Sequence, residues 1–335
     1  MEVFDMQIVD TIRKFPAGMQ VIPLLMGCTM NTFFPEALQI GSFTTGLFAS
    51  SGAATAVGMF MFCSGATIDV KKMGEPFAKG FLMLAVKYIV GMALGLCIGN
   101  IFGPAGILGI TPLALIGATT NSNGVMYGTL AKKVGVPNDV GAIAPLAFND
   151  GPFLTMVALG ASGMADIPVK SLVAALVPLF LGMILANLDE KIRTMCDNAA
   201  PFLIPFNGWT LGAGMTWDSV LKAGVPGIIL GLITLVSTGL VTYYIFNLVF
   251  RRGQRPLATG CGVGNTAGNA ISTPKFVAEA DPSLSGSVPL ATAQVAMSCV
   301  VTAILCPLLT TWLDKRITKK YGELDRSGFK ESSEW

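Results

Sequence analysis

Apolar stretches long enough to span a membrane recur along the whole chain. At least eight of them contain about 17–25 mainly apolar residues, the length that crosses roughly 30 Å of hydrocarbon as a helix. Glycine, proline and asparagine interrupt some of these stretches. The pattern predicts an all-α membrane protein with ten transmembrane helices, at residues 15–34, 45–68, 77–101, 110–134, 138–162, 169–188, 199–216, 224–250, 256–281 and 287–313.

Composition agrees with this fold class and excludes several kinds of chemistry. Hydrophobic residues make up 52% of the 335 residues and charged residues 13%, whereas soluble domains carry about 25% charge. The chain has no histidine, the commonest general base and metal ligand, and none of its seven cysteines forms a CxxC pair. We therefore expect no enzyme activity, metal site or cofactor, and the net charge of +2 does not indicate nucleic-acid binding.

Basic residues are concentrated on alternate connections between the ten segments. One side of the predicted membrane holds eighteen of the 22 Lys and Arg residues, whereas the other side holds Lys170, Lys222 and Lys275. Cytoplasmic loops carry the excess of Lys and Arg in membrane proteins. The asymmetry predicts a multi-pass protein of the lipid bilayer with both termini in the cytoplasm, and residues 314–335 as a cytoplasmic tail.

A weak internal repeat relates the two halves of the chain. A shift of 144 residues places 121–124 on 265–268, with the pattern N-[S/T]-x-G in both, and places 145–147 on 289–291. Each half then holds five crossings, so the second copy has the opposite orientation, as in many secondary transporters. We expect a first repeat at 1–165 and an inverted second repeat at 166–313, with chance matching of short peptides as the alternative.

The fourth and ninth segments are predicted to be broken helices. Glycine lowers helix propensity by about 1 kcal/mol, and Asn, Ser and Thr compete for backbone hydrogen bonds. Unwound backbone is tolerated at membrane depth where it lines a cavity, and the two helix ends at a break attract an anion and a cation. The alternative is packing glycines with polar helix contacts. The candidate substrate-binding residues are Thr119, Thr120, Asn121, Ser122, Asn123, Gly124, Asn265, Thr266, Gly268 and Asn269.

Two ionisable residues lie near the middle of the predicted membrane. Lys87 lies about ten residues into the third segment and Asp150 about twelve into the fifth, which places both near mid-depth. They could form an ion pair, either of functional importance or merely structural, and such residues are functional by default. The repeat partner of Asp150 is Gln294, which we add to the candidate substrate site. Without a histidine, Asp150 is the first candidate for proton coupling.

Several short motifs occur in a fixed order over nearly the whole chain: 15–19 with 22–24, 41–46, 62–68, 120–124, 151–152 with 154–156, 182 with 187–189, and 204–206. Their order and spacing resemble the 2-keto-3-deoxygluconate permease family. This resemblance implies a bacterial inner-membrane symporter that takes up a sugar-acid anion with protons. It also implies kinship with the bile-acid/sodium symporter fold, with crossings 3–5 and 8–10 as a core domain and crossings 1, 2, 6 and 7 as a panel domain.

One position departs from the family pattern. In the family, the acid before Gly-Pro can be a glutamate at the position of Asn149, whereas this chain carries Asp150 one place later. A shift of one residue turns a helix position by about 100°. The candidate coupling residues are therefore Asp150, Lys87 and Asn149.

The expected mechanism is alternating access. The carboxylate of a small sugar acid would lie near residues 122–124 and 266–269, Asp150 would carry the proton, and Lys87 would tune Asp150 or neutralise the substrate. A proton is the expected coupling cation and sodium a possible one. The alternative function is a sodium-coupled carrier of another organic anion. The oligomeric state stays open.

Overall fold

Helices form almost all of the ordered structure. The computed structural model describes residues 7–325 except residues 16, 73, 252 and 254. Across these residues there is no β-strand, and a single isolated bridge joins Ile107 to Ile110. The prediction of an all-helical chain is confirmed.

The helices of the first half follow a short N-terminal helix, α1 (Ile8–Arg13). The first three predicted segments contain α2 (Gly18–Phe33), then α3 (Ser42–Phe48) with α4 (Ala53–Ala66), then α5 (Glu75–Phe102). The fourth and fifth contain α6 (Pro112–Thr120) with α7 (Gly124–Val134), then α8 (Pro137–Val140), α9 (Ile143–Leu146) and α10 (Phe153–Ala161).

The helices of the second half overlap the predicted segments, but α12 and α13 begin before them. The sixth to eighth correspond to α11 (Val169–Leu188), α12 (Glu190–Gly212), and α13 (Trp217–Thr234) with α14 (Val241–Val249), joined by the π-helical turn Leu235–Leu240. The ninth contains the 3₁₀ turns Ala258–Val263 and Asn269–Ser272 and α15 (Thr273–Ala280), and the tenth corresponds to α16 (Val288–Tyr321). The last helix continues to Tyr321, so the predicted tail at 314–335 begins as helix and not as a separate segment.

Only part of the predicted set of ten crossings passes a test of length and hydropathy. Four helical stretches of the described chain are long and apolar enough to cross a membrane: 75–102, 169–188, 217–249 and 282–321. Two bent pairs raise the number to six, one at 42–66 with a bend of 71° and one at 137–161 with a bend of 57°. The full count of ten stays a prediction.

Both predicted helix breaks are present. The backbone leaves the helix between α6 and α7 at residues 121–123, and in the ninth segment between Val263 and Asn269. The start of α7 has a local cause: the Asn123 side chain accepts a hydrogen bond from the Met126 N–H at 2.9 Å, which satisfies a donor that a helix start leaves unpaired.

A third interruption corrects the expectation of a continuous fifth helix. The backbone turns at Asp150, Gly151 adopts a left-handed φ of +74°, and α10 starts after Pro152. Glycine adopts this conformation without steric cost and proline cannot donate the next helical hydrogen bond. Asp150 therefore lies at the end of a short helix, not in the interior of a long one.

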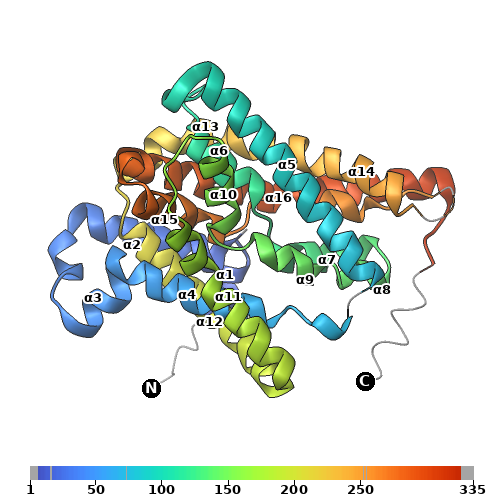
Figure 1. The fold of residues 1–335 in the computed structure, drawn as a ribbon, viewed down its shortest axis with the longest axis horizontal. Coiled ribbons are helices and arrows are strands. Elements are labelled where there is room, and N and C mark those ends of the chain that lie inside the picture. Colours follow the sequence, from blue (N-terminus) through green and yellow to red (C-terminus); the bar gives the residue numbers. More distant parts are fainter. Residues whose placement is uncertain (1–6, 16, 73, 252, 254, 326–335) are drawn as a thin grey trace.

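The helices pack in two groups. In one group α2 packs against α12, and α4 packs against both α11 and α12; in the other, α13 packs against α16 and α5 against α6 (Figure 1). Glycines allow close approach in the first group, because a Cβ on Gly212 would lie 1.9 Å from the Leu24 carbonyl oxygen. Asp150 and both helix breaks lie where these groups meet.

Candidate functional site

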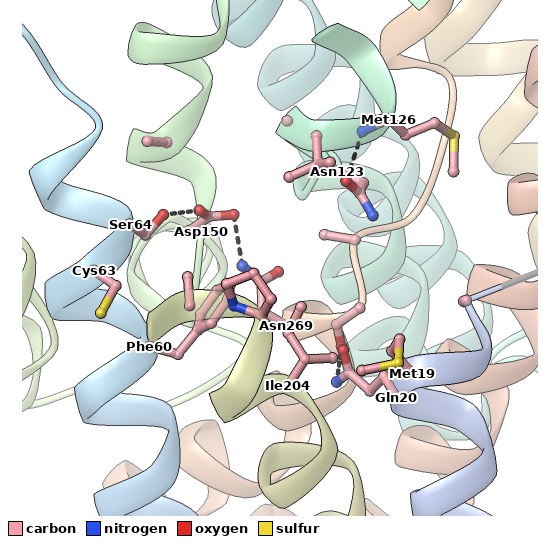
Figure 2. A pocket seen from close by; sticks show the side chains of 18 of the residues that line it. Met19, Gln20, Phe60, Cys63, Ser64, Asn123, Met126, Asp150, Ile204 and Asn269 are labelled. Atoms are coloured by element: carbon pink, nitrogen blue, oxygen red, sulfur yellow. Dashed lines mark hydrogen bonds between the residues drawn. The ribbon is translucent and has the colours of Figure 1, made fainter. Parts of the chain in front are cut away.

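A cavity of about 490 Å³ lies beside the two helix breaks. Its wall comes from α2, α4, α9 and α12, from the start of α7, and from residues 267–269 of the ninth segment. Known small-molecule sites have volumes of about 300–1,000 Å³. The cavity therefore has the size of a small-ligand site, and Figure 2 shows the polar side chains that enter it.

Asp150 is the acidic centre of this cavity. The Ser64 hydroxyl donates to its Oδ2 atom, and the Asn269 Nδ2 atom donates to its Oδ1 atom at 2.5 Å (Figure 2). Ser64 belongs to α4 and Asn269 follows the ninth-segment break. The carboxylate therefore connects three segments that are far apart in the sequence.

The two breaks are joined directly to each other. The Asn123 N–H donates to the Asn265 side-chain oxygen at 2.6 Å, and the Thr266 hydroxyl lies 3.2 Å from the Ala118 carbonyl oxygen. Thr266 is also held by α16, because its N–H donates to the Thr302 hydroxyl at 2.9 Å. These contacts fix the shape of the unwound backbone, so Asn265 and Thr266 support the site from behind.

The predicted substrate residues divide into those on the cavity wall and those buried behind it. Asn123, Gly124, Gly268 and Asn269 line the cavity together with Asp150. The others are buried away from this wall, and several bond within the scaffold: Thr119, Thr120, Asn121, Ser122, Asn265 and Thr266.

Asn149, the other candidate coupling residue of the fifth segment, is buried beside the first break. The Ser122 N–H donates to its side-chain oxygen at 3.3 Å. Asn149 thus ties the bend of the fifth segment to the break of the fourth. Asn149 does not line the cavity itself.

Gln294 lies elsewhere than expected. Its Nε2 atom donates to the Gly109 carbonyl oxygen at 2.5 Å, and its Oε1 atom accepts from the Thr111 N–H at 3.4 Å. These bonds hold the turn before α6, and Gln294 is not part of the cavity wall. The polar residue related to Asp150 by the repeat therefore does not share its cavity.

Lys87 does not pair with Asp150, in contrast to the ion pair considered from the sequence. Its ammonium donates to Thr238 Oγ1 at 3.2 Å and to the carbonyl oxygens of Val263 and Asn265 at 2.9 Å each. The equal depth of the two residues did not reveal on which side of the ninth segment each would lie. Lys87 bonds to the ninth segment where its first helical turn ends, at Val263 and Asn265. Asp150 bonds to Asn269, where the helix of the ninth segment starts again.

Several cavity residues were not predicted. Gln20 of α2 donates from Nε2 to the Gly268 carbonyl oxygen at 2.7 Å, and Ser64 of α4 bonds to Asp150. A lone glutamine in an otherwise apolar stretch is a signal that could have indicated Gln20, because a buried amide needs a partner. Arg13 and Asp197 add one basic and one further acidic side chain to the wall.

The polar groups on the cavity wall are hydrogen-bonding and ionisable side chains. Over the described residues, no group of three or more His, Cys, Asp or Glu side chains is placed to hold a metal ion. The wall instead offers amides, two hydroxyls, one guanidinium and two carboxylates. The helix α7 starts on this wall at Gly124, and a helix start favours a negative charge.

The arrangement of helices is shared with a known membrane transporter. The chain resembles the structure of a sodium/proton antiporter from Methanocaldococcus jannaschii with a TM-score of 0.60, covering 90% of this chain and 94% of that one at 13% identity. At this identity the likeness shows the fold alone. The fold is that of a helical membrane transporter.

The family follows from the sequence. The family described as 2-keto-3-deoxygluconate permease matches residues 9–319. The chain is 44% identical to 2-keto-3-deoxygluconate permease 1 of Salmonella typhimurium over 93% of this chain and 96% of that one. It is 34% identical to 2-keto-3-deoxygluconate permease of Bacillus subtilis over 94% and 96%. The chain therefore belongs to the 2-keto-3-deoxygluconate permease family, a family of transporters and not of enzymes.

Proposed function

We propose that the protein is a secondary active transporter of the bacterial inner membrane that takes up 2-keto-3-deoxygluconate, or a similar sugar-acid anion, together with a proton. The observation that carries this proposal is Asp150, held by Ser64 and Asn269 in a cavity at the helix breaks. The curated relatives named above are permeases of this sugar acid. The substrate and its coupling to protons are the parts to be tested.

The cavity offers partners for both ends of a sugar acid. We place the substrate carboxylate at the start of α7, near Gly124, where the helix end favours an anion. The Oδ1 atom of Asn269 is buried and has no hydrogen-bond partner among the described residues. A buried polar atom without a partner is costly, and a sugar hydroxyl would supply that partner.

Repulsion between two negative charges would couple the binding of a proton to the binding of the substrate. A substrate anion and an ionised Asp150 would lie in one cavity, where two negative charges disfavour each other. Protonation of Asp150 removes this repulsion, so proton and anion bind together. The Ser64 hydroxyl can donate to a carboxylate or accept from a carboxylic acid, whereas the Asn269 Nδ2 atom only donates. The proton therefore belongs on Oδ2, facing Ser64.

Alternating access would use the two packing groups as panel and core. We assign α2, α4, α11 and α12 to the panel and the remaining crossings to the core, within inverted repeats at 1–165 and 166–313. Two bonds cross this boundary beside the cavity, Ser64 to Asp150 and Gln20 to Gly268. Because both bonds lie beside the cavity, a substrate that displaces them would link binding to the movement of the core.

Uptake into proteoliposomes tests the proposal. With an inward proton gradient, the wild type is expected to accumulate labelled 2-keto-3-deoxygluconate above the external concentration. Asp150→Asn keeps a neutral hydrogen-bonding side chain but carries no proton, so it should exchange substrate in counterflow without accumulating it.

The matched control is Asp218→Asn, which changes an exposed carboxylate on α13 and should accumulate substrate like the wild type. Accumulation by Asp150→Asn would assign the proton to another group. If 2-keto-3-deoxygluconate neither enters the vesicles nor competes for uptake, the proposed substrate is wrong. Uptake driven by sodium at equal pH would favour the sodium-coupled carrier.

A further inference from the structure

Lys87 is a completely buried cation outside the cavity. Its side chain on α5 has 0% exposure, and no ion pair of the described residues includes it. Three oxygen atoms surround its Nζ atom: Thr238 Oγ1 at 3.2 Å and the carbonyl oxygens of Val263 and Asn265 at 2.9 Å. A buried charge without an ion-pair partner requires such compensation.

The hydrogen bonds around Nζ define its charge. Carbonyl oxygens only accept, so Val263 and Asn265 each take one N–H from Lys87. The Thr238 hydroxyl hydrogen is already donated to the Thr234 carbonyl oxygen at 2.7 Å, so Thr238 also accepts from Lys87. Three accepting oxygens require three N–H donors, and only the ammonium form of lysine has three.

Two irregular backbone segments create this oxygen cage. The ninth-segment break frees the carbonyl groups at Val263 and Asn265 from helical hydrogen bonds, and the π-helical turn Leu235–Leu240 carries Thr238. Unwound carbonyls at the end of a half-helix coordinate sodium ions in other transporters. Here the same kind of oxygen set surrounds a side chain of the protein itself.

We propose that Lys87 is a tethered cation, which occupies the position at the ninth-segment break that a free monovalent cation would otherwise take. The free carbonyl oxygens of the break are then satisfied without sodium. The only cation left to exchange during the transport cycle is the proton on Asp150 in the cavity. This last consequence rests on the proposed function. The occupancy of the oxygen cage does not, and it is measured on purified protein without substrate.

Chemical replacement of the missing ammonium tests this proposal. Lys87→Ala removes the side chain beyond Cβ, and n-propylammonium has the size of the removed part. Thermal unfolding of this variant in detergent should shift upward by about 2–4 °C or more at saturating n-propylammonium chloride, because a ligand bound only to the folded state stabilises it. Sodium chloride should stabilise the variant more than choline chloride does.

Two matched variants separate cation binding from general effects. Lys87→Met fills the space without a charge, and Lys222→Ala removes an exposed lysine of α13; neither should respond to n-propylammonium or sodium. The wild type should not respond either. The proposal is overturned if Lys87→Ala and Lys87→Met respond alike, or if the wild type is stabilised by sodium and Lys87→Ala loses that response.

A second measurement covers the case in which Lys87→Ala does not fold. Lys87→Gln keeps two N–H donors for the two carbonyl oxygens but carries no charge. If Lys87 is a tethered cation, uptake by Lys87→Gln should fall at least about tenfold in choline, and sodium at equal pH on both sides should restore part of it. Uptake equal to that of the wild type in choline would overturn the proposal without affecting the proposed substrate.

Discussion

At the scale of the residue, the two mid-depth charges have separate surroundings. The sequence predicted that Asp150 and Lys87 lie at membrane depth, and it suggested contact between them. It could not predict that the bend at Gly151 and the break at 264–268 would place them against different ends of the ninth segment. Lys87 therefore bonds to carbonyl oxygens of the ninth segment, whereas Asp150 bonds to Asn269 beside the cavity.

An acidic residue at the other end of the ninth segment provides a prediction at this scale. Asp281, just after α15, accepts hydrogen bonds from the Ser283 hydroxyl and N–H at 2.7 and 3.0 Å and from the Asp166 N–H at 2.7 Å. These bonds, led by the Ser283 hydroxyl, hold the pKa of Asp281 below its ordinary value of 3.8. The stabilisation is therefore complete above pH 3.8 and is lost as pH falls through the lower folded value.

Asp281→Asn should lower the melting temperature by a small amount, about 1–2 °C, because the site is exposed. The decrease should be the same at pH 5 and pH 8 and should shrink near pH 3, as measured by thermal unfolding in detergent. A decrease that grows as the pH falls would contradict the assigned role of the ionised carboxylate.

At the scale of the element, some helix interruptions could be predicted from the sequence and others were missed. Clusters of Gly, Asn, Ser and Thr predicted the breaks in the fourth and ninth segments, because those residues weaken a helix and satisfy unwound backbone. The bends at 49–52 and 150–152 were missed, although Gly151-Pro152 is a strong interruption signal. Apolar residues flank both bends on each side, so hydropathy averaged over a long window hides them.

Glycine packing in α4 gives a prediction at this scale. A Cβ on Gly65 would lie 1.9 Å from the Leu179 carbonyl oxygen of α11, whereas no atom lies within 4 Å of a Cβ on Gly58 of the same helix. Gly65→Ala should destabilise the protein by about 1–3 kcal/mol, the usual cost of overpacking. Gly58→Ala should be neutral or slightly stabilising, since alanine favours helix.

Thermal unfolding of the two variants in one detergent compares them directly. Because both changes add the same methyl group to α4, any difference between them reports the α4–α11 contact. Equal melting temperatures would show that the two helices do not pack as closely as the structure has them.

At the scale of the whole molecule, the sequence predicted more of the family than of the site. The order of motifs indicated the permease family, and the family match over residues 9–319 confirms it. Of the predicted site residues, Asn123, Gly124, Asp150, Gly268 and Asn269 line the cavity. Gln20 carried a signal in the sequence that was not used. Ser64 could not be assigned to the cavity, because only the packing of α4 beside the fifth-segment bend brings it there.

Proton movement coupled to substrate is the claim on which the account depends. Proteoliposomes that contain a pH-sensitive dye, with equal pH on both sides and no sodium, measure it directly. Addition of 2-keto-3-deoxygluconate outside should acidify the interior with the wild type and not with Asp150→Asn, and external sodium should not change the wild-type rate. Substrate entry without acidification, or only with sodium, would contradict the account.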